Sequence, residues 1–214
     1  MIPLSDIDRR PVHFPVITYL IIATNIFIFF LELQRGDAFI LQWAVIPSEI
    51  AAGNGLFNIV SAMFLHGGWM HIIGNMIYLW AFGPEIEDVM GRVRYPVFYL
   101  LGGAAAFLAQ VLMDPSSEVP NLGASGAIAA VMGAFLVTFP RDRIRTLVFI
   151  GWYITITFIP ALILVGFWFA LQLLSEVGSV MANKSDGVAY MAHVGGIAFG
   201  IVTARIFEIR KRLT

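Results

Sequence analysis

The stretch "PNLGASGAIAAVMGAF" (residues 120–135) contains only two residues, Asn121 and Ser125, that are neither apolar nor glycine. It lies inside a run without Asp, Glu, Lys or Arg at 119–140, which is long enough to cross the hydrocarbon core of a bilayer as a helix. A serine in such a run is either a packing residue that bonds back to its own helix or a nucleophile. The rest of the sequence has to decide between these two interpretations.

Composition places the chain among membrane proteins. It has 214 residues, of which 59% are hydrophobic and 13% charged, and its mean hydropathy is +0.83. A chain of this composition is too apolar to be a soluble domain of this length. The absence of cysteine excludes disulfides and thiolate metal sites. A net charge of −1 is not the positive charge that is typical of nucleic-acid-binding proteins.

Uncharged runs predict the spans, because a helix needs about 20 apolar residues to cross the membrane. These runs are 11–31, 50–84, 95–113, 119–140, 146–175 and 187–204. We expect an all-α, six-transmembrane-helix bundle forming one domain over 1–214, with helices near 16–33, 69–83, 95–113, 124–139, 158–176 and 189–207. The stretch 146–157 is expected to be a loop or an interfacial segment before the fifth helix.

Basic residues predict the orientation of these helices. All of the 13 Lys and Arg except Arg35 and Lys184 fall at the two termini or between helices 2 and 3 or 4 and 5. Since loops rich in Lys and Arg stay in the cytoplasm, both termini are expected there.

The same topology brings four polar residues to one depth. Helices 2, 4 and 6 then run inward from the outer surface, which places His71, Asn75, Ser125 and His193 within about two turns of that surface. Polar side chains inside a membrane are costly and usually functional. His71 and Asn75 are four residues apart and share a helix face.

Small residues predict close packing of helices 4 and 6. Small residues let helices approach closely in lipid, and the two stripes are Ser125, Ala129 and Gly133, and His193, Gly196 and Gly200. Close packing would bring the Ser125 hydroxyl within reach of His193. Backbone N–H groups at the start of helix 4, with His71 and Asn75, could then stabilise an oxyanion. No carboxylate lies in these runs, so we expect a Ser–His dyad rather than a triad.

Three motifs in order resemble the rhomboid intramembrane serine proteases: "FLHGGWMHIIGN" (64–75), "GASGA" (123–127) and "AHVGG" (192–196). The segment "FGPEIEDVMGRVRYPVFYLLGG" (82–103) is also similar to that family, and the resemblance covers roughly residues 14–206.

The resemblance implies a serine endopeptidase that cuts transmembrane proteins in the bilayer without a metal or cofactor. It makes Ser125 the nucleophile and His193 the general base. His71 and Asn75, with Gly123 and Ala124, would lie at the oxyanion. His66, Glu87, Gly126, Gly196 and Gly200 are expected to be structural. The implied location is a prokaryotic plasma membrane, with the active site toward the extracytoplasmic side, while the oligomeric state stays open.

The sequence departs from the family pattern at a position that would contact His193. Some family members carry an aromatic residue four positions after the nucleophile that packs against the catalytic histidine, and here that position is Ala129. Tyr190 is a candidate substitute. Helix 5 and the outer loop at 183–187 are both candidate gates for substrate.

Other classes of function are weighed against this one. A catalytically inactive rhomboid-like binding protein would share the fold, and a small transporter would show polar sites at the midplane. His66 and His71 are poorly placed to bind one metal ion together, because residues five apart do not share a helix face. The chain has no HExxH motif, which excludes a membrane zinc protease of that type.

Overall fold

The computed structural model describes residues 1–181 and 190–209. Most of these residues are helical. The elements are β1 (Ile2–Asp6), α1 (Val16–Arg35), α2 (Asp37–Trp43), α3 (Pro47–Ala51), α4 (Asn58–Ser61), the 3-10 helix η1 (Ala62–Phe64), α5 (Trp69–Met113), α6 (Ser125–Thr138), β2 (Arg143–Ile150), β3 (Tyr153–Pro160), α7 (Ala161–Met181) and α8 (Tyr190–Phe207).

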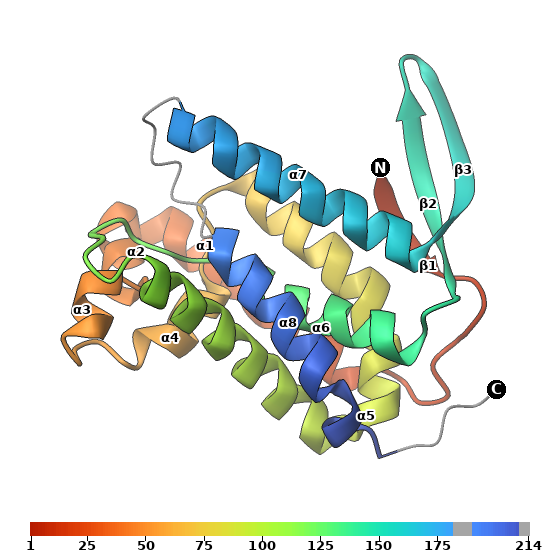
Figure 1. Ribbon diagram of the computed structural model, residues 1–214, viewed down its shortest axis with the longest axis horizontal. Coiled ribbons are helices and arrows are strands. Elements are labelled where there is room, and N and C mark those ends of the chain that lie inside the picture. Colours follow the sequence, from red (N-terminus) through yellow and green to blue (C-terminus); the bar gives the residue numbers. More distant parts are fainter. Residues whose placement is uncertain (182–189, 210–214) are drawn as a thin grey trace.

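The long helix α5 consists of two arms. Gly91 has a φ of 75°, which an L side chain rarely adopts, and this residue interrupts the helix. The chain reverses there, so that the arms 69–90 and 92–113 run in opposite directions, with α6 and α8 between them in the view of Figure 1. The stretch 84–94, between the expected helices 69–83 and 95–113, is therefore helical apart from this one residue.

Helices α6 and α8 form the centre of the bundle with α5. Every residue of α6 except Ser125, Leu136 and Val137 is buried. At about 1.5 Å per residue, its 14 residues span only about 21 Å, less than the bilayer core. A short helix is tolerated because its neighbours, rather than lipid, surround it.

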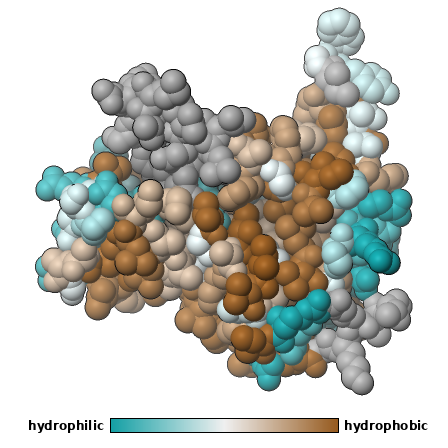
Figure 2. All heavy atoms as spheres, in the orientation of Figure 1, coloured by the Kyte–Doolittle hydropathy of each residue, from teal (hydrophilic) through white to brown (hydrophobic). Residues whose placement is uncertain are grey.

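Apolar surface covers the middle of the molecule. Figure 2 shows hydrophobic side chains across the bundle and hydrophilic ones gathered toward its two ends. Among the described residues, α1 and α5 are long and apolar enough to cross a membrane, and 125–138, 161–171 and 191–207 are shorter apolar helices. The chain is thus a mostly helical protein with the surface of a membrane protein.

The two ends of the bundle differ. Helices α2, α3 and α4 gather at one end (Figure 1). The sheet lies at the other end, with strand order β1-β2-β3 and both pairs antiparallel.

The sheet corrects the expectation that the described chain is entirely helical. Residues 146–157, expected to be a loop or interfacial segment, form most of a β-hairpin, and Phe158 belongs to β3. Helix α7 consequently begins at Ala161, three residues later than expected. β-Branched and aromatic residues on both sides of Gly151 favour strands, and Gly151 itself has a φ of 59° in the turn.

Glu87 holds two distant segments together at the sheet end. Its carboxylate accepts hydrogen bonds from the backbone N–H of Ile17 (3.0 Å) and Thr18 (2.7 Å) and from the Thr18 hydroxyl (2.8 Å). Negative charge at the first turn of a helix satisfies free N–H groups and stabilises the helix. Glu87 thus fixes the start of α1 against α5, far from Ser125.

Candidate active site

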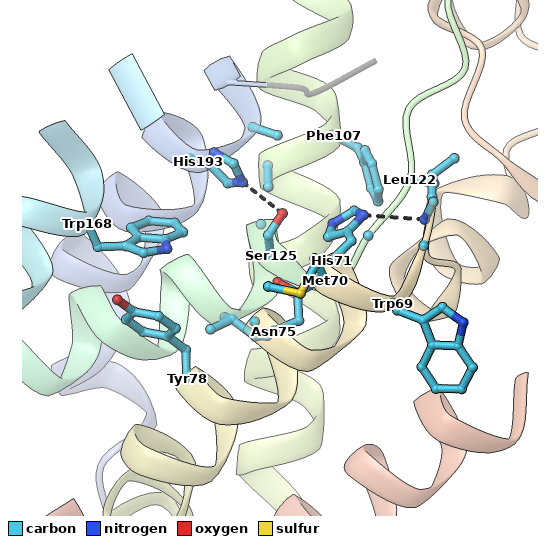
Figure 3. A pocket seen from close by; sticks show the side chains of 18 residues that line it. Trp69, Met70, His71, Asn75, Tyr78, Phe107, Leu122, Ser125, Trp168 and His193 are labelled. Atoms are coloured by element: carbon cyan, nitrogen blue, oxygen red, sulfur yellow. Dashed lines mark hydrogen bonds between the residues drawn. The ribbon is translucent and has the colours of Figure 1, made fainter. Parts of the chain in front are cut away.

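Ser125 is the first residue of α6. The loop before α6 descends into the bundle, and Asn121 forms a two-bond bridge with Val45 there (2.9 and 2.7 Å). This path starts α6 below the surface, so that Ser125 lies at the wall of a cavity of about 740 Å³. His71, Asn75, Gly123, Gly126 and His193 line the same cavity (Figure 3).

Close packing of α6 and α8 brings His193 to Ser125. A methyl group at Gly196 would overlap the carbonyl oxygen of Gly126, and one at Gly200 would overlap the carbonyl oxygen of Ala130. These glycines therefore allow backbone-to-backbone contact, as the small-residue stripes predicted. The result is a distance of 2.7 Å between His193 Nε2 and Ser125 Oγ.

His193 is almost completely buried, at 4% exposure. A ring nitrogen at this distance from a hydroxyl can accept its proton, which is the geometry that general-base activation of a nucleophile requires. The sequence predicted that these two side chains could meet, and the structure brings them together.

Trp168 on α7 packs against the imidazole of His193. The two ring centroids are 5.1 Å apart, with an interplanar angle of 65°. Ala129, at the position where an aromatic residue was considered, is fully buried between helices. The candidate substitute Tyr190 has a side chain outside the described residues. Trp168 therefore supplies an aromatic contact that sequence reasoning did not assign to the histidine.

His71 faces the cavity with a defined tautomer. The backbone N–H of Gly67 donates a hydrogen bond to His71 Nδ1 (3.3 Å; Figure 3). A neutral imidazole that accepts at Nδ1 carries its proton on Nε2. That nitrogen lies next to Gly123 on the side of Ser125, so it is placed to donate to a group bound at the hydroxyl.

Asn75 adds a second candidate donor. It lies one turn after His71, and its side-chain nitrogen is buried without a hydrogen-bond partner among the described residues. Buried polar groups normally have a partner. A donor left open at the wall of a cavity is suited to a developing negative charge.

Gly123 contributes shape rather than a donor. Its φ is +127°, and a Cβ there would lie 2.8 Å from His71 Nε2. Its own N–H donates to the carbonyl oxygen of Ala62 (2.8 Å). Glycine is therefore needed for space beside His71, while Ala124, which immediately precedes α6, is fully buried.

His66 is placed behind the site. Its backbone N–H donates to both carboxylate oxygens of Glu32 (3.1 and 3.2 Å), and its ring contacts those of Phe29 and His71. The ring does not line the cavity. Sequence reasoning did not single out Glu32, although an acid within the last turn of an apolar helix was a signal for a buried role.

Comparison with known proteins gives the family. Residues 53–209 match the Rhomboid domain. The chain is 28% identical over 92% of its length to Rhomboid protease GluP of Bacillus subtilis (strain 168), and 25% identical over 61% to Putative rhomboid protease YdcA of the same strain. It is 24% identical over 87% to Rhomboid protein 1, mitochondrial, of Saccharomyces cerevisiae.

These alignments cover different shares of the relatives: 36% of GluP, 67% of YdcA and 51% of the yeast protein. The chain therefore spans about a third of the GluP length and about half of the yeast protein. The domain match covers most of the chain and includes all three motifs around Ser125, His71 and His193. This chain belongs to the rhomboid family.

Proposed function

We propose that the protein is an intramembrane serine endopeptidase that hydrolyses peptide bonds in or near the transmembrane helices of other proteins. The observation that carries this proposal is the 2.7 Å approach of His193 Nε2 to Ser125 Oγ at the wall of an open cavity. Relatives named rhomboid protease support the same class of activity.

The proposed chemistry uses the chain's own residues. Ser125 Oγ attacks the carbonyl carbon while its proton passes to His193 Nε2, and the same nitrogen then gives the proton to the departing amine. His71 Nε2–H and the Asn75 amide stabilise the oxyanion. A water molecule, deprotonated by His193, then hydrolyses the acyl-enzyme and regenerates Ser125.

Substrate access is proposed between α7 and the first arm of α5. Trp168 of α7 contacts Tyr78 of α5 with ring centroids 5.8 Å apart, and both rings line the cavity (Figure 3). A helix that separates these rings would reach Ser125 from the side. A helical peptide bond is shielded by its own hydrogen bonds, so helix-breaking residues near the cut should favour cleavage.

The proposed topology has six spans, formed by α1, the two arms of α5, α6, α7 and α8. Both termini then lie in the cytoplasm, as the basic residues indicate, and the cavity opens toward the extracytoplasmic side of a prokaryotic plasma membrane.

A test that needs no natural substrate is labelling by serine-directed electrophiles. The detergent-solubilised protein would be treated with a fluorophosphonate and an isocoumarin, beside Ser125→Ala and His193→Ala. We expect labelling of the unaltered protein only. If the folded protein reacts with neither reagent, the proposal fails and the inactive rhomboid-like binding protein takes its place.

A further inference from the structure

The β2–β3 hairpin is larger than its contacts with the bundle require. β1 pairs with β2 only between Ile144 and Leu147, whereas β2 and β3 continue pairing to Ile150 and Tyr153. The outer half of the hairpin is thus two-stranded among the described residues. Two-stranded hairpins are marginally stable in water, so this half needs another surface to stabilise it.

One face of this hairpin is apolar. Residues directly opposite each other in an antiparallel pair share a face. One face therefore carries Leu147 with Ile156, Phe149 with Ile154, and Arg145 with Phe158. The other carries Ile144 with Ile159, Thr146 with Thr157, and Val148 with Thr155, and at Ile144 and Thr146 it is fully buried.

The apolar face is exposed in the isolated chain. Phe149, Ile154, Ile156 and Phe158 are each 45–59% exposed, and Trp152 at the tip is 98% exposed. A contiguous exposed apolar surface of this kind marks contact with another protein or with a membrane.

The position of the hairpin favours contact with the membrane over contact with another protein. The hairpin lies at the end of the bundle where α6 ends, whereas Ser125 is the first residue of α6. The hairpin runs across the direction of the helices and projects past α7 (Figure 1). Its apolar lower half adjoins the apolar surface around α7 (Figure 2), where Leu162 and Ile163 are also about 60% exposed. The apolar face is thus continuous with the surface that a bilayer covers.

The aromatic residues at the tip of the hairpin and the arginine at its base also fit a location at the membrane surface. Trp152 and Tyr153 occupy the tip, and tryptophan and tyrosine prefer the headgroup region of bilayers. Arg145, exposed at the base, has a long side chain that can extend to lipid phosphates.

We propose that the β2–β3 hairpin inserts into the interfacial zone of the bilayer leaflet opposite the active-site cavity, with its apolar face toward the acyl chains. β3 ends at Pro160 and α7 begins at the next residue. The hairpin therefore sets the depth at which α7, the helix that carries Trp168, enters the membrane.

The chain has no cysteine, so single-cysteine variants can be labelled cleanly. Ile154→Cys and Ile156→Cys place an environment-sensitive nitrobenzoxadiazole dye on the apolar face, while Thr155→Cys and Thr157→Cys place it on the other. In phosphatidylcholine–phosphatidylglycerol vesicles we expect quenching by spin-labelled lipids to alternate along the strand. Dyes at 154 and 156 should be quenched by lipid, and dyes at 155 and 157 by aqueous iodide.

Equal iodide quenching at all four positions would overturn the proposal. A blue-shifted dye at 154 and 156 that no spin-labelled lipid quenches, and whose shift fades on dilution into excess lipid, would overturn it in favour of contact between two copies. These measurements do not depend on whether the protein is a protease.

The effect on proteolysis rests on the proposed function and has its own test. The triple variant Phe149→Ser/Ile154→Ser/Ile156→Ser should cleave a transmembrane substrate in vesicles several-fold more slowly than the matched control Thr155→Ser/Thr157→Ser. Fluorophosphonate labelling of Ser125 in detergent should be the same for both. Unchanged cleavage would refute the coupling to α7, whereas absent labelling in the unaltered protein would refute the proposed function instead.

Discussion

Trp168 gives a prediction at the scale of single residues, because its ring is the aromatic contact of His193. Trp168→Ala should leave the imidazole free to tilt away from Ser125, and misplacement of a reacting group by about 1 Å can cost about 100-fold. We expect fluorophosphonate labelling to slow by about 10- to 100-fold, with most of the rate retained in Trp168→Phe.

Tyr78→Ala is the matched control. It removes the other half of the same α5–α7 ring contact but leaves the Trp168–His193 contact in place. Its labelling by a small electrophile should be near normal. Equal losses in Tyr78→Ala and Trp168→Ala would show that the helix contact matters and that His193 is not oriented by Trp168.

Asn75 tests the proposed oxyanion donors. Asn75→Ala should lower kcat for peptide hydrolysis by on the order of 10²–10³ if its amide donates to the oxyanion. KM should change little, because the interaction forms in the transition state. Steady-state kinetics on a transmembrane substrate would separate the two constants, and a loss confined to KM would contradict the assigned role.

At this scale the sequence predicted most of the site. Ser125, His193, His71 and Asn75 could be placed together because alternating helix directions and counted turns fix the depth of each residue. Trp168 could not be placed beside His193 from the sequence. Which side of α7 faces the histidine depends on how the helix packs, and the apolar residues of α7 do not determine this. The position of Glu32 in an apolar helix was a signal for burial, but its partner, a backbone N–H group, could not be identified from the sequence.

Helix α8 gives a prediction at the scale of elements. A methyl group at Gly196 would overlap the Gly126 carbonyl oxygen and lie 3.0 Å from the Ala129 side chain. Gly196→Ala should therefore push α8 away from α6, separate His193 from Ser125 and abolish labelling. Gel filtration and circular dichroism would establish that the helices still form.

Gly166→Ala in α7 is the control for the added methyl group. Nothing lies within 4 Å of a Cβ there, and alanine is favoured over glycine in a helix by about 1 kcal/mol. This variant should label normally and be at least as stable as the unaltered protein. Normal labelling of Gly196→Ala would refute the close-packing argument.

The elements themselves show where sequence reasoning fails. Helices α1, α6 and α8 lie close to their predicted bounds, because uncharged runs mark all three and small-residue stripes mark the close packing of α6 and α8. The sequence predicts a loop or an interfacial segment at 146–157, and not a hairpin, because the apolar residues of this stretch merge with those of α7 into one uncharged run at 146–175. In a membrane protein an apolar run suggests a span, and this masks the alternation of isoleucine and threonine at 154–157 that favours a strand.

At the scale of the whole molecule, charges at the sheet end tie the first residues to the middle of the chain. Arg9 Nε lies 2.6 Å from Asp142, and the Arg143 guanidinium lies 2.8 Å from Asp8. The hydrogen bond from Arg143 lowers the pKa of the Asp8 carboxyl. Hydropathy and charge predicted that this end is polar, but the specific partners depend on the unpredicted sheet.

Asp6 makes the stability of the molecule depend on pH. Burial, together with the negative charge of Asp142, raises the pKa of the Asp6 carboxyl from 3.8 to about 7. Between these two values the folded protein binds more protons at this site than the unfolded chain does. The contribution of Asp6 to the free energy of unfolding is therefore greatest below pH 3.8 and is lost as the pH rises through 7.

Asp6→Asn removes this titration, while an asparagine oxygen can still accept the hydrogen bond from the Asp8 N–H (2.8 Å). Relative to the unaltered protein, we expect its Tm in detergent to rise progressively between pH 4 and pH 8, with the largest advantage at pH 8. Using the difference between the two proteins cancels the other titrating groups, which both share. A Tm difference that stays constant over this range would show that Asp6 ionises alike in the folded and unfolded states.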